Sequence, residues 1–257
     1  MPFSIESLEH LQGFFWVFMR VSVLFFLLPL FGARGVPTLW KIGLSMIVAI
    51  VLTPAVPVPQ TYPATVLEIL LGMTAELLMG FIIALTIKMT FAVVEMAGHF
   101  MSFQMGFAMA RAMDPQTGSE STVLTQFVYL FTILIFLSID GHHIFIRALA
   151  SSFHIVPPNS FSFDPSLSNI LIHVSGNMFL VGLKIAAPIL VALFLSNLCL
   201  GIVARTVPQV NILMVGFPIN LCIGLILFGL VLRNISPLLV DLTKKMGDML
   251  IHLIQLM

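Results

Sequence analysis

Three charged side chains interrupt long apolar stretches of this sequence, at Arg20, Glu76 and Lys184. Each stands near the centre of a run whose other residues are mostly aliphatic or aromatic. A charge at the mid-depth of a bilayer costs at least about 2.5–3.5 kcal/mol, so such a residue normally faces protein or water. The sequence therefore leaves two alternatives open: these buried charges pair inside a helical bundle, or they line a polar pathway.

A second group that could do chemistry is the run Asp140-Gly141-His142-His143. Adjacent histidines on a helix point about 100° apart, which makes them a poor pair of ligands for one metal ion. We therefore predict a solvated helix start with Asp140 as its N-cap. The sequence shows no GxSxG, HExxH or phosphate-binding glycine loop, and no second carboxylate lies near Glu76 on the same helical face. We predict no catalytic, metal or cofactor site, and no enzyme.

The segment 95–120 is rich in methionine, whose flexible and polarizable side chain fills irregular gaps and repacks readily. Glycines allow close helix approach there, and the Asp114-Pro115 pair ends the helix. Two interpretations stay open, a methionine-rich core helix followed by a loop at about 106–121, or a deformable plug in a conduit. The candidate plug residues are Met105, Gly106, Phe107, Met109, Met113, Asp114, Pro115, Gln116 and Gly118.

A polar interruption, ARTVPQVNILMVGFPINL at 204–221, separates two strongly apolar runs. We predict that Pro208 and Pro218 break the helix where polar side chains can satisfy the freed backbone groups, as non-helical backbone at membrane depth requires. The pattern is that of a tight helical hairpin. Its defining residues are Arg205, Pro208, Gln209, Asn211, Gly216, Phe217 and Pro218.

The elements that must position these residues belong to a very apolar chain. Of its 257 residues, 59% are hydrophobic and 9% are charged, whereas a soluble domain carries about 25% charged residues. Most of the surface must therefore meet lipid or other protein, and the zero net charge gives no nucleic-acid footprint. A bilayer crossing takes about 20 apolar residues. Six apolar runs separated by proline or glycine clusters are candidates: 11–31, 42–53, 64–94, 122–139, 169–203 and 212–232.

These runs predict an all-α, polytopic membrane-associated protein of long bent helices and helical hairpins, with 1–257 as a single helical domain. The run 169–203 is too long for one ordinary crossing and contains Pro188. The tail 235–257 repeats apolar residues at spacings of three and four, which indicates an amphipathic helix on a membrane surface or on a partner. The N-terminus lacks a basic region, so we expect the first apolar run to remain as a membrane segment.

Several of these stretches together resemble the FliR family, the export-gate proteins of the bacterial flagellar type III secretion system, which are similar to the SctT proteins of injectisomes. The resemblance rests on MGFAMARAMDPQTG, Asp140-Gly141-His142, Ala187-Pro188, and ARTVPQVN followed by Gly216-Phe217-Pro218. It covers essentially the whole chain, and the ARxxPQxN…GFP stretch is long and compositionally unusual.

The resemblance implies a core subunit of the flagellar export gate in the bacterial inner membrane, at the flagellar basal body. Such subunits assemble with FliP-like and FliQ-like proteins into a hetero-oligomer that an FlhB-like subunit joins. They contact membrane lipid and help to form the channel that passes unfolded flagellar proteins across the inner membrane. The resemblance also implies that the loop 106–121 plugs the channel. The alternative is a secondary transporter or channel with a midplane polar site built from Glu76 and Lys184, although the two halves of the sequence show no convincing internal repeat.

Overall fold

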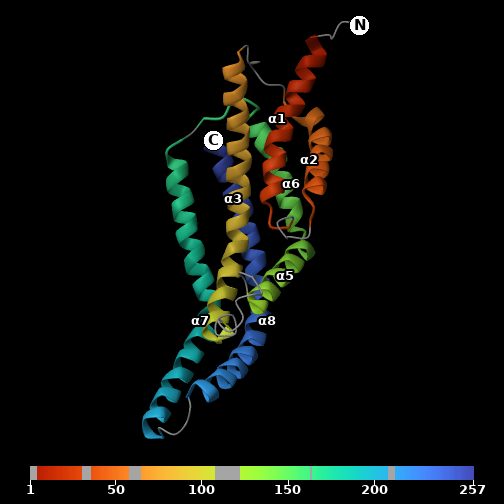
Figure 1. The fold of residues 1–257 in the computed structure, drawn as a ribbon. Helices are drawn as coiled ribbons and strands as arrows, with labels where there is room; N and C mark the ends of the chain where they lie inside the picture. Colours follow the sequence, from red (N-terminus) through yellow and green to blue (C-terminus); the bar gives the residue numbers. More distant parts are fainter. Residues whose placement is uncertain (1–4, 31–35, 58–64, 108–121, 163, 208–211) are drawn as a thin grey trace. The chain divides into compact units, whose positions relative to one another are not determined.

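The computed structural model describes residues 5–30, 36–57, 65–107, 122–162, 164–207 and 212–257, and within these ranges the chain is helical with short connections and no strand (Figure 1). The predicted all-α fold is confirmed. The helices are α1 (Ile5–Leu27), α2 (Thr38–Leu52), the short 3₁₀ helix η1 (Thr53–Ala55), α3 (Val66–Gln104), α5 (Val123–Ser138), α6 (Gly141–Ile155), α7 (Ser166–Thr206) and α8 (Ile212–Gln255).

Among the described residues, four helices are long and apolar enough to cross a membrane, or five if α5 and α6 form one span that is broken at Ile139 and Asp140. Helices α3, α7 and α8 contain 39, 41 and 44 residues. At about 1.5 Å per residue each exceeds the roughly 30 Å thickness of a hydrocarbon core. These features confirm a polytopic helical membrane protein.

Proline explains some of the helix ends but not all of them. Helix α2 ends just before Pro54, and α6 ends before Pro157, as predicted. The predicted break at Pro218 is wrong, because Pro218 lies inside α8. A proline removes one i→i−4 hydrogen bond, and neighbouring helices and local adjustments compensate for that loss in membrane helices. Pro208 lies outside the described residues.

Helix α8 also continues through Pro237, so the tail predicted as a separate amphipathic helix at 235–257 is the second half of one long helix. The amphipathic pattern itself is present, and its apolar side chains are buried by the chain's own fold. No separate partner or membrane surface is needed to explain that face. Its buried residues are Ile235, Leu239, Met246, Leu250, Leu253 and Ile254.

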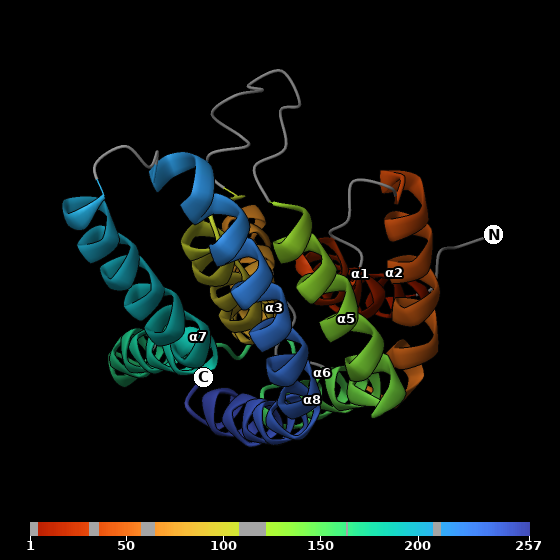
Figure 2. The same cartoon turned by 90° about the horizontal axis from the view of Figure 1, so that it is seen from below.

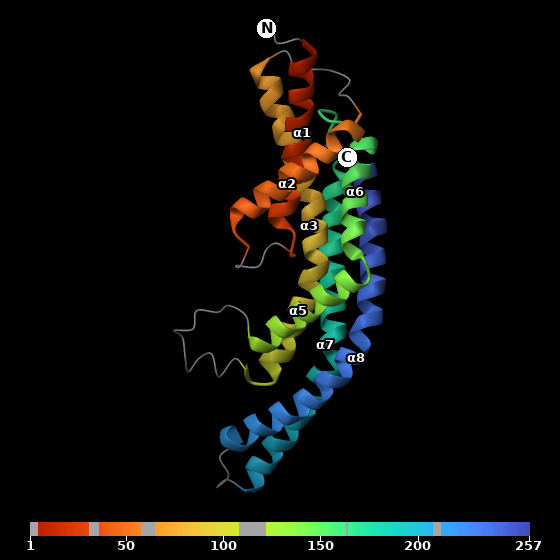
Figure 3. The same ribbon diagram turned by 90° about the vertical axis from the view of Figure 1, so that its right-hand side faces the viewer.

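The chain separates into two compact units. The first comprises Met1–Thr90, Asp140–His173 and Thr243–Met257, and the second comprises Phe91–Ile139 and Val174–Leu242. In the first unit α1 lies beside α2 (Figure 3). Buried side chains from α1, α3, α6 and the end of α8 form its interior, among them Val21, Met79, Phe153 and Leu250. The backbone N–H of Ser162 donates to the carbonyl of Met257 at 2.8 Å, which holds Met257 against the segment that follows α6.

In the second unit, the later part of α7 and the earlier part of α8 run side by side (Figures 1 and 3), and α5 lies along α8 (Figure 2). The rings of Phe127 and Phe228 meet edge to face between α5 and α8 with centroids 6.1 Å apart. One core cluster joins the four helices. Its fully buried members include Val94, Ala97 and Met101 on α3, Met105 just after α3, Val128 on α5, and Ala186, Ile189 and Leu193 on α7.

Candidate functional site

The most elaborate polar site in the described residues is a buried ion pair in the first unit. Arg20 on α1 and Glu76 on α3 are both 0% exposed, and Arg20 Nε donates to Glu76 Oε2 at 2.7 Å. Removing two charges from water is costly, and their mutual attraction repays the cost only when further hydrogen bonds satisfy the remaining donors and acceptors. The neighbours of the pair decide whether that condition holds.

Those neighbours come from α6 and the connection that follows it. Arg20 Nη1 donates to Ser152 Oγ at 3.1 Å and to the carbonyl of Val156 at 3.2 Å, and Nη2 donates to the same carbonyl at 3.3 Å. The backbone N–H of Asn159 donates to Glu76 Oε1 at 3.1 Å. The guanidinium carbon of Arg20 also lies 4.2 Å from the centroid of the Phe153 ring. Both charges are therefore held by a network that joins α1, α3 and α6.

Two glycines on α3 allow this network to form. A Cβ added at Gly80 would come within 2.6 Å of the carbonyl oxygen of Arg20, so the backbones of α1 and α3 approach closely one turn after Glu76. A Cβ at Gly72 would come within 2.5 Å of the Trp16 ring and 2.6 Å of Asn159 Oδ1. Asn159 has φ of 67°, a left-handed conformation that asparagine tolerates better than most residues. The two glycines and the left-handed backbone of Asn159 thus allow the partners of both charges to come close enough to bind them.

Lys184, the third charge singled out in the sequence, is in a different situation. It lies on α7 in the second unit and is exposed in this chain. No described carboxylate lies within ion-pair distance of it. Burial of Lys184 by protein therefore remains a prediction about an assembly rather than a property of the single chain.

The described part of the candidate plug is its start, at Met105, Gly106 and Phe107 in the second unit. Met105 is fully buried, and its side chain occupies the space where a Cβ at Gly224 of α8 would stand, with Met105 Cγ only 2.5 Å from that position. Gly106 has φ of 89°, and a Cβ there would meet the Phe217 ring at 2.9 Å. The end of α3 is thereby fixed against α8. Met109, Met113, Asp114, Pro115, Gln116 and Gly118 lie outside the described residues.

The hairpin motif is described in part. Arg205 is exposed in the last turn of α7, and Gly216, Phe217 and Pro218 lie near the start of α8. Pro208, Gln209 and Asn211 are outside the described residues. Sequence reasoning missed a polar clamp between the two helices, in which Ser196 Oγ donates to Asn220 Oδ1 at 3.0 Å and Asn220 Nδ2 donates to Asn197 Oδ1 at 2.7 Å. The sequence could have indicated this clamp, because Ser196, Asn197 and Asn220 are polar residues inside apolar runs.

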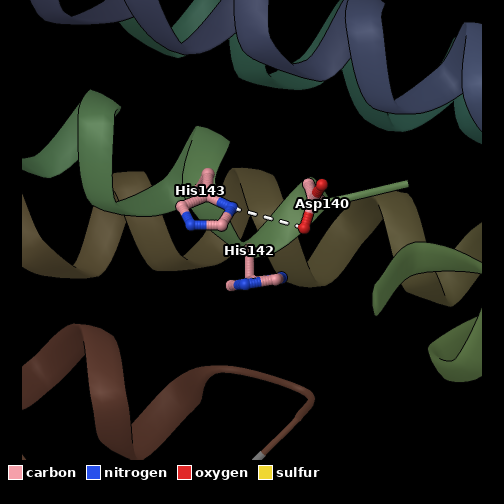
Figure 4. A group of neighbouring side chains, drawn as sticks. All are labelled: Asp140, His142 and His143. Carbon is pink, nitrogen blue, oxygen red and sulfur yellow. Dashed lines mark ion pairs between the residues drawn. The ribbon is translucent and has the colours of Figure 1, made fainter. Parts of the chain in front are cut away.

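Asp140, His142 and His143 gather at the start of α6 (Figure 4). Asp140 is the N-cap residue, as predicted, but with φ of 56° its side chain makes no capping hydrogen bond. The histidine rings lie closer than the helical geometry suggested, with centroids 4.2 Å apart, and one potential ligand atom from each residue lies within 4.8 Å of the others. Asp140 and His143 are 75% and 57% exposed and 3.6 Å apart, an ion pair only when His143 is protonated. We assign no metal to this group.

The fold and these contacts define a class of protein, a polytopic helical membrane protein whose interior holds a hydrogen-bonded pair of buried charges. The comparison with known families makes the assignment specific. Residues 11–246 match the family described as "Bacterial export proteins, family 1", and the chain belongs to that family.

Curated relatives match over nearly their whole length. The chain is 34% identical to the flagellar biosynthetic protein FliR of Bacillus subtilis (strain 168), over 93% of this chain and 96% of the relative. It is 34% identical to FliR of Pectobacterium carotovorum subsp. carotovorum, over 96% and 94% of the two chains. It is 29% identical to FliR of Escherichia coli (strain K12), over 98% of this chain and 96% of the relative.

Proposed function

We propose that this chain is a core subunit of the bacterial flagellar type III protein export gate and helps to form the channel through which unfolded flagellar proteins cross the inner membrane. The observation that carries the proposal is the match, over nearly the full length of both chains, to proteins named flagellar biosynthetic protein FliR. In this role the chain works by packing and by forming a conduit, without catalysis or a cofactor.

The proposed partners are FliP-like and FliQ-like subunits, with an FlhB-like subunit joining the assembled core at the flagellar basal body. The surface of the chain supports a role in an assembly. Large apolar side chains are exposed on most helices, for example Leu39 at 78%, Trp40 at 73% and Ile226 at 70%. Apolar surface of this extent is covered by lipid or by other subunits.

A secondary transporter with a midplane site is the less favoured function. Such a site needs a polar side chain that is free to bind a substrate or an ion. Both carboxylate oxygens of Glu76 are instead engaged, one by Arg20 and one by the N–H of Asn159. This arrangement fits a structural role of Glu76 better than a binding role.

We further propose that the loop 106–121 closes the channel in the resting assembly. A closure has to seal against ions and still move aside for a polypeptide. Methionine side chains can seal without a rigid interlock, and the fixed start of the loop at Met105 and Gly106 gives it a defined origin.

Deleting 114–119 tests the closure. The deletion should leave the complex assembled, because it spares the residues that pack against α8, and it should increase the leakage of ions or small solutes through the membrane. A deletion of equal length in the connection 58–63 is the matched control. If the complex with the 114–119 deletion assembles normally and has the conductance of the wild type, the segment 106–121 only connects two helices and does not close the channel.

A further inference from the structure

The feature of the second unit that the proposed function leaves unexplained is Lys184. It is the only Asp, Glu, Lys or Arg residue in the sequence between Asp164 and Arg205. Its neighbours along the exposed side of α7 are apolar, among them Leu180 at 53%, Val191 at 58% and Leu195 at 55% exposure. An isolated ammonium group thus stands in the middle of an apolar surface.

The orientation of Lys184 is fixed by the opposite side of α7. Ile185, Ile189 and Leu193 are buried in the core cluster of the second unit. Gly182 is packed so closely that a Cβ there would come within 2.9 Å of the carbonyl oxygen of Val93 on α3. Helix α7 cannot rotate to bury Lys184 without exposing these residues, so the lysine points away from this chain's core.

The backbone at Lys184 adds a second polar group. Pro188, four residues later, lies inside α7 and is exposed. Proline has no N–H, so it cannot donate the helical hydrogen bond that the carbonyl of Lys184 would otherwise accept. Lys184 therefore combines a cation with a carbonyl that has lost its usual donor, at one point of a helix that is apolar enough to cross a membrane.

Lipid is a poor occupant of this face. The ammonium group would cost at least about 2.5–3.5 kcal/mol at mid-depth, and backbone groups in hydrocarbon need an internal partner. Lys184 lies 18 residues from the start of α7 and 22 from its end, which is about 27 and 33 Å of helix at 1.5 Å per residue. Lys184 therefore lies near the middle of α7, with apolar helix on both sides of it.

We infer that the α7 face around Lys184 is a docking surface for a membrane helix of another subunit, and that this helix places an aspartate or glutamate opposite Lys184. The carboxylate pairs with the ammonium group, and the apolar residues Leu180, Val191 and Leu195 pack along the same helix. The inference rests on the proposed function, because it needs an assembly of several membrane subunits.

The test uses the chain co-expressed with FliP-like and FliQ-like proteins. Lys184→Met keeps the length of the side chain without its charge, Lys184→Glu reverses the charge, and Lys184→Arg preserves it. We expect Lys184→Met and Lys184→Glu to lower the yield of intact complex at least tenfold, because each leaves a partner carboxylate without its cation, while Lys184→Arg retains most of it. Lys244→Met and Lys244→Glu, at an exposed lysine on α8 in the first unit, should assemble as the wild type does.

A selection for restored motility from Lys184→Glu locates the partner. Suppressors should replace an acidic residue in a membrane helix of another subunit by lysine or arginine, which a merely misfolded variant would not give. Wild-type assembly of Lys184→Met and Lys184→Glu would overturn the inference in favour of a water-facing lysine. Equal damage by Lys184→Arg would overturn it too, since charge would not be the requirement. Absence of any complex with the wild-type chain would contradict the proposed function instead.

Discussion

The Arg20–Glu76 pair shows how a single buried interaction organises the first unit. Each charge is completely withdrawn from solvent, and each is held by partners from more than one element. A buried pair of this kind contributes little net stability when intact, yet removal of one partner leaves an uncompensated charge. The pair joins α1 and α3 to each other and, through Ser152, to α6.

Replacing Glu76 by alanine should destabilise the protein by about 3–5 kcal/mol, because Arg20 would remain buried without its counter-ion. The double variant Arg20→Met with Glu76→Leu should be more stable than Glu76→Ala alone, since it removes both charges and preserves volume. Thermal unfolding of the detergent-solubilised complex measures both effects, with Lys244→Ala as a surface control. An undisturbed complex carrying Glu76→Ala would show that water reaches the carboxylate.

Gly80 controls the approach of α1 to α3. A methyl group there would meet the carbonyl oxygen of Arg20 at 2.6 Å and Val23 Cβ at 3.2 Å, and a backbone atom cannot swing away. We expect Gly80→Ala to cost about 1–3 kcal/mol. Gly13→Ala on α1, where nothing lies within 4 Å of the added Cβ, should be neutral or slightly stabilising because alanine favours the helix. The same melting experiment compares the two, and equal behaviour would remove the argument for close packing.

The sequence allowed the charged members of the Arg20 site to be predicted but not their remaining partners. A charged residue inside an apolar run is easily seen in a sequence, and because a charge in lipid is energetically costly, it indicates a special environment. The carbonyl of Val156 and the N–H of Asn159 are backbone groups, which every residue has, so no residue type marks them. Lys184 shows the converse limit, since its sequence context suggested burial, whereas in the single chain it is exposed.

At the level of helices, residues of α8 fix the position of the backbone just after the end of α3. The Met105 side chain fills the space beside Gly224, and Phe217 covers Gly106. Gly224→Ala should displace Met105 and shift the backbone at Gly106, whereas Gly229→Ala on the same helix meets nothing within 4 Å. Overpacking of this kind costs about 1–3 kcal/mol.

The double variant Gly224→Ala with Met105→Ala should be more stable than the sum of the two single changes predicts, because the smaller side chain makes room for the methyl group. The melting temperature of the assembled complex measures this coupling. Strict additivity of the two substitutions would mean that Met105 does not occupy that space.

The presence of helices and their approximate ends could be predicted from the composition and the positions of proline. Whether a helix continues through a proline could not. Apolar runs without breakers predicted helices, and Pro54 and Pro157 coincide with helix ends. Pro188, Pro218 and Pro237 lie inside helices instead. A proline costs one hydrogen bond, and packing on both sides of it decides whether the helix continues, which is tertiary information that a local pattern does not contain.

The whole molecule presents an apolar surface that the chain cannot cover alone. Exposed Leu39, Trp40, Met214 and Ile226 are each at least 70% accessible, and only 28% of the most apolar stretch of α7 is buried. A protein of this kind should aggregate or unfold when produced by itself, even in detergent. Partner subunits should rescue it by covering the protein-facing part of that surface.

The central claim, that this chain is one subunit of a hetero-oligomeric export gate, is tested most directly by native mass spectrometry of the affinity-tagged chain, purified after expression alone and after co-expression with FliP-like and FliQ-like proteins. We predict an unstable or aggregated product in the first case and a single discrete complex containing all three kinds of subunit in the second. A stable, fully helical monomer in detergent that ignores the co-expressed proteins would contradict the account.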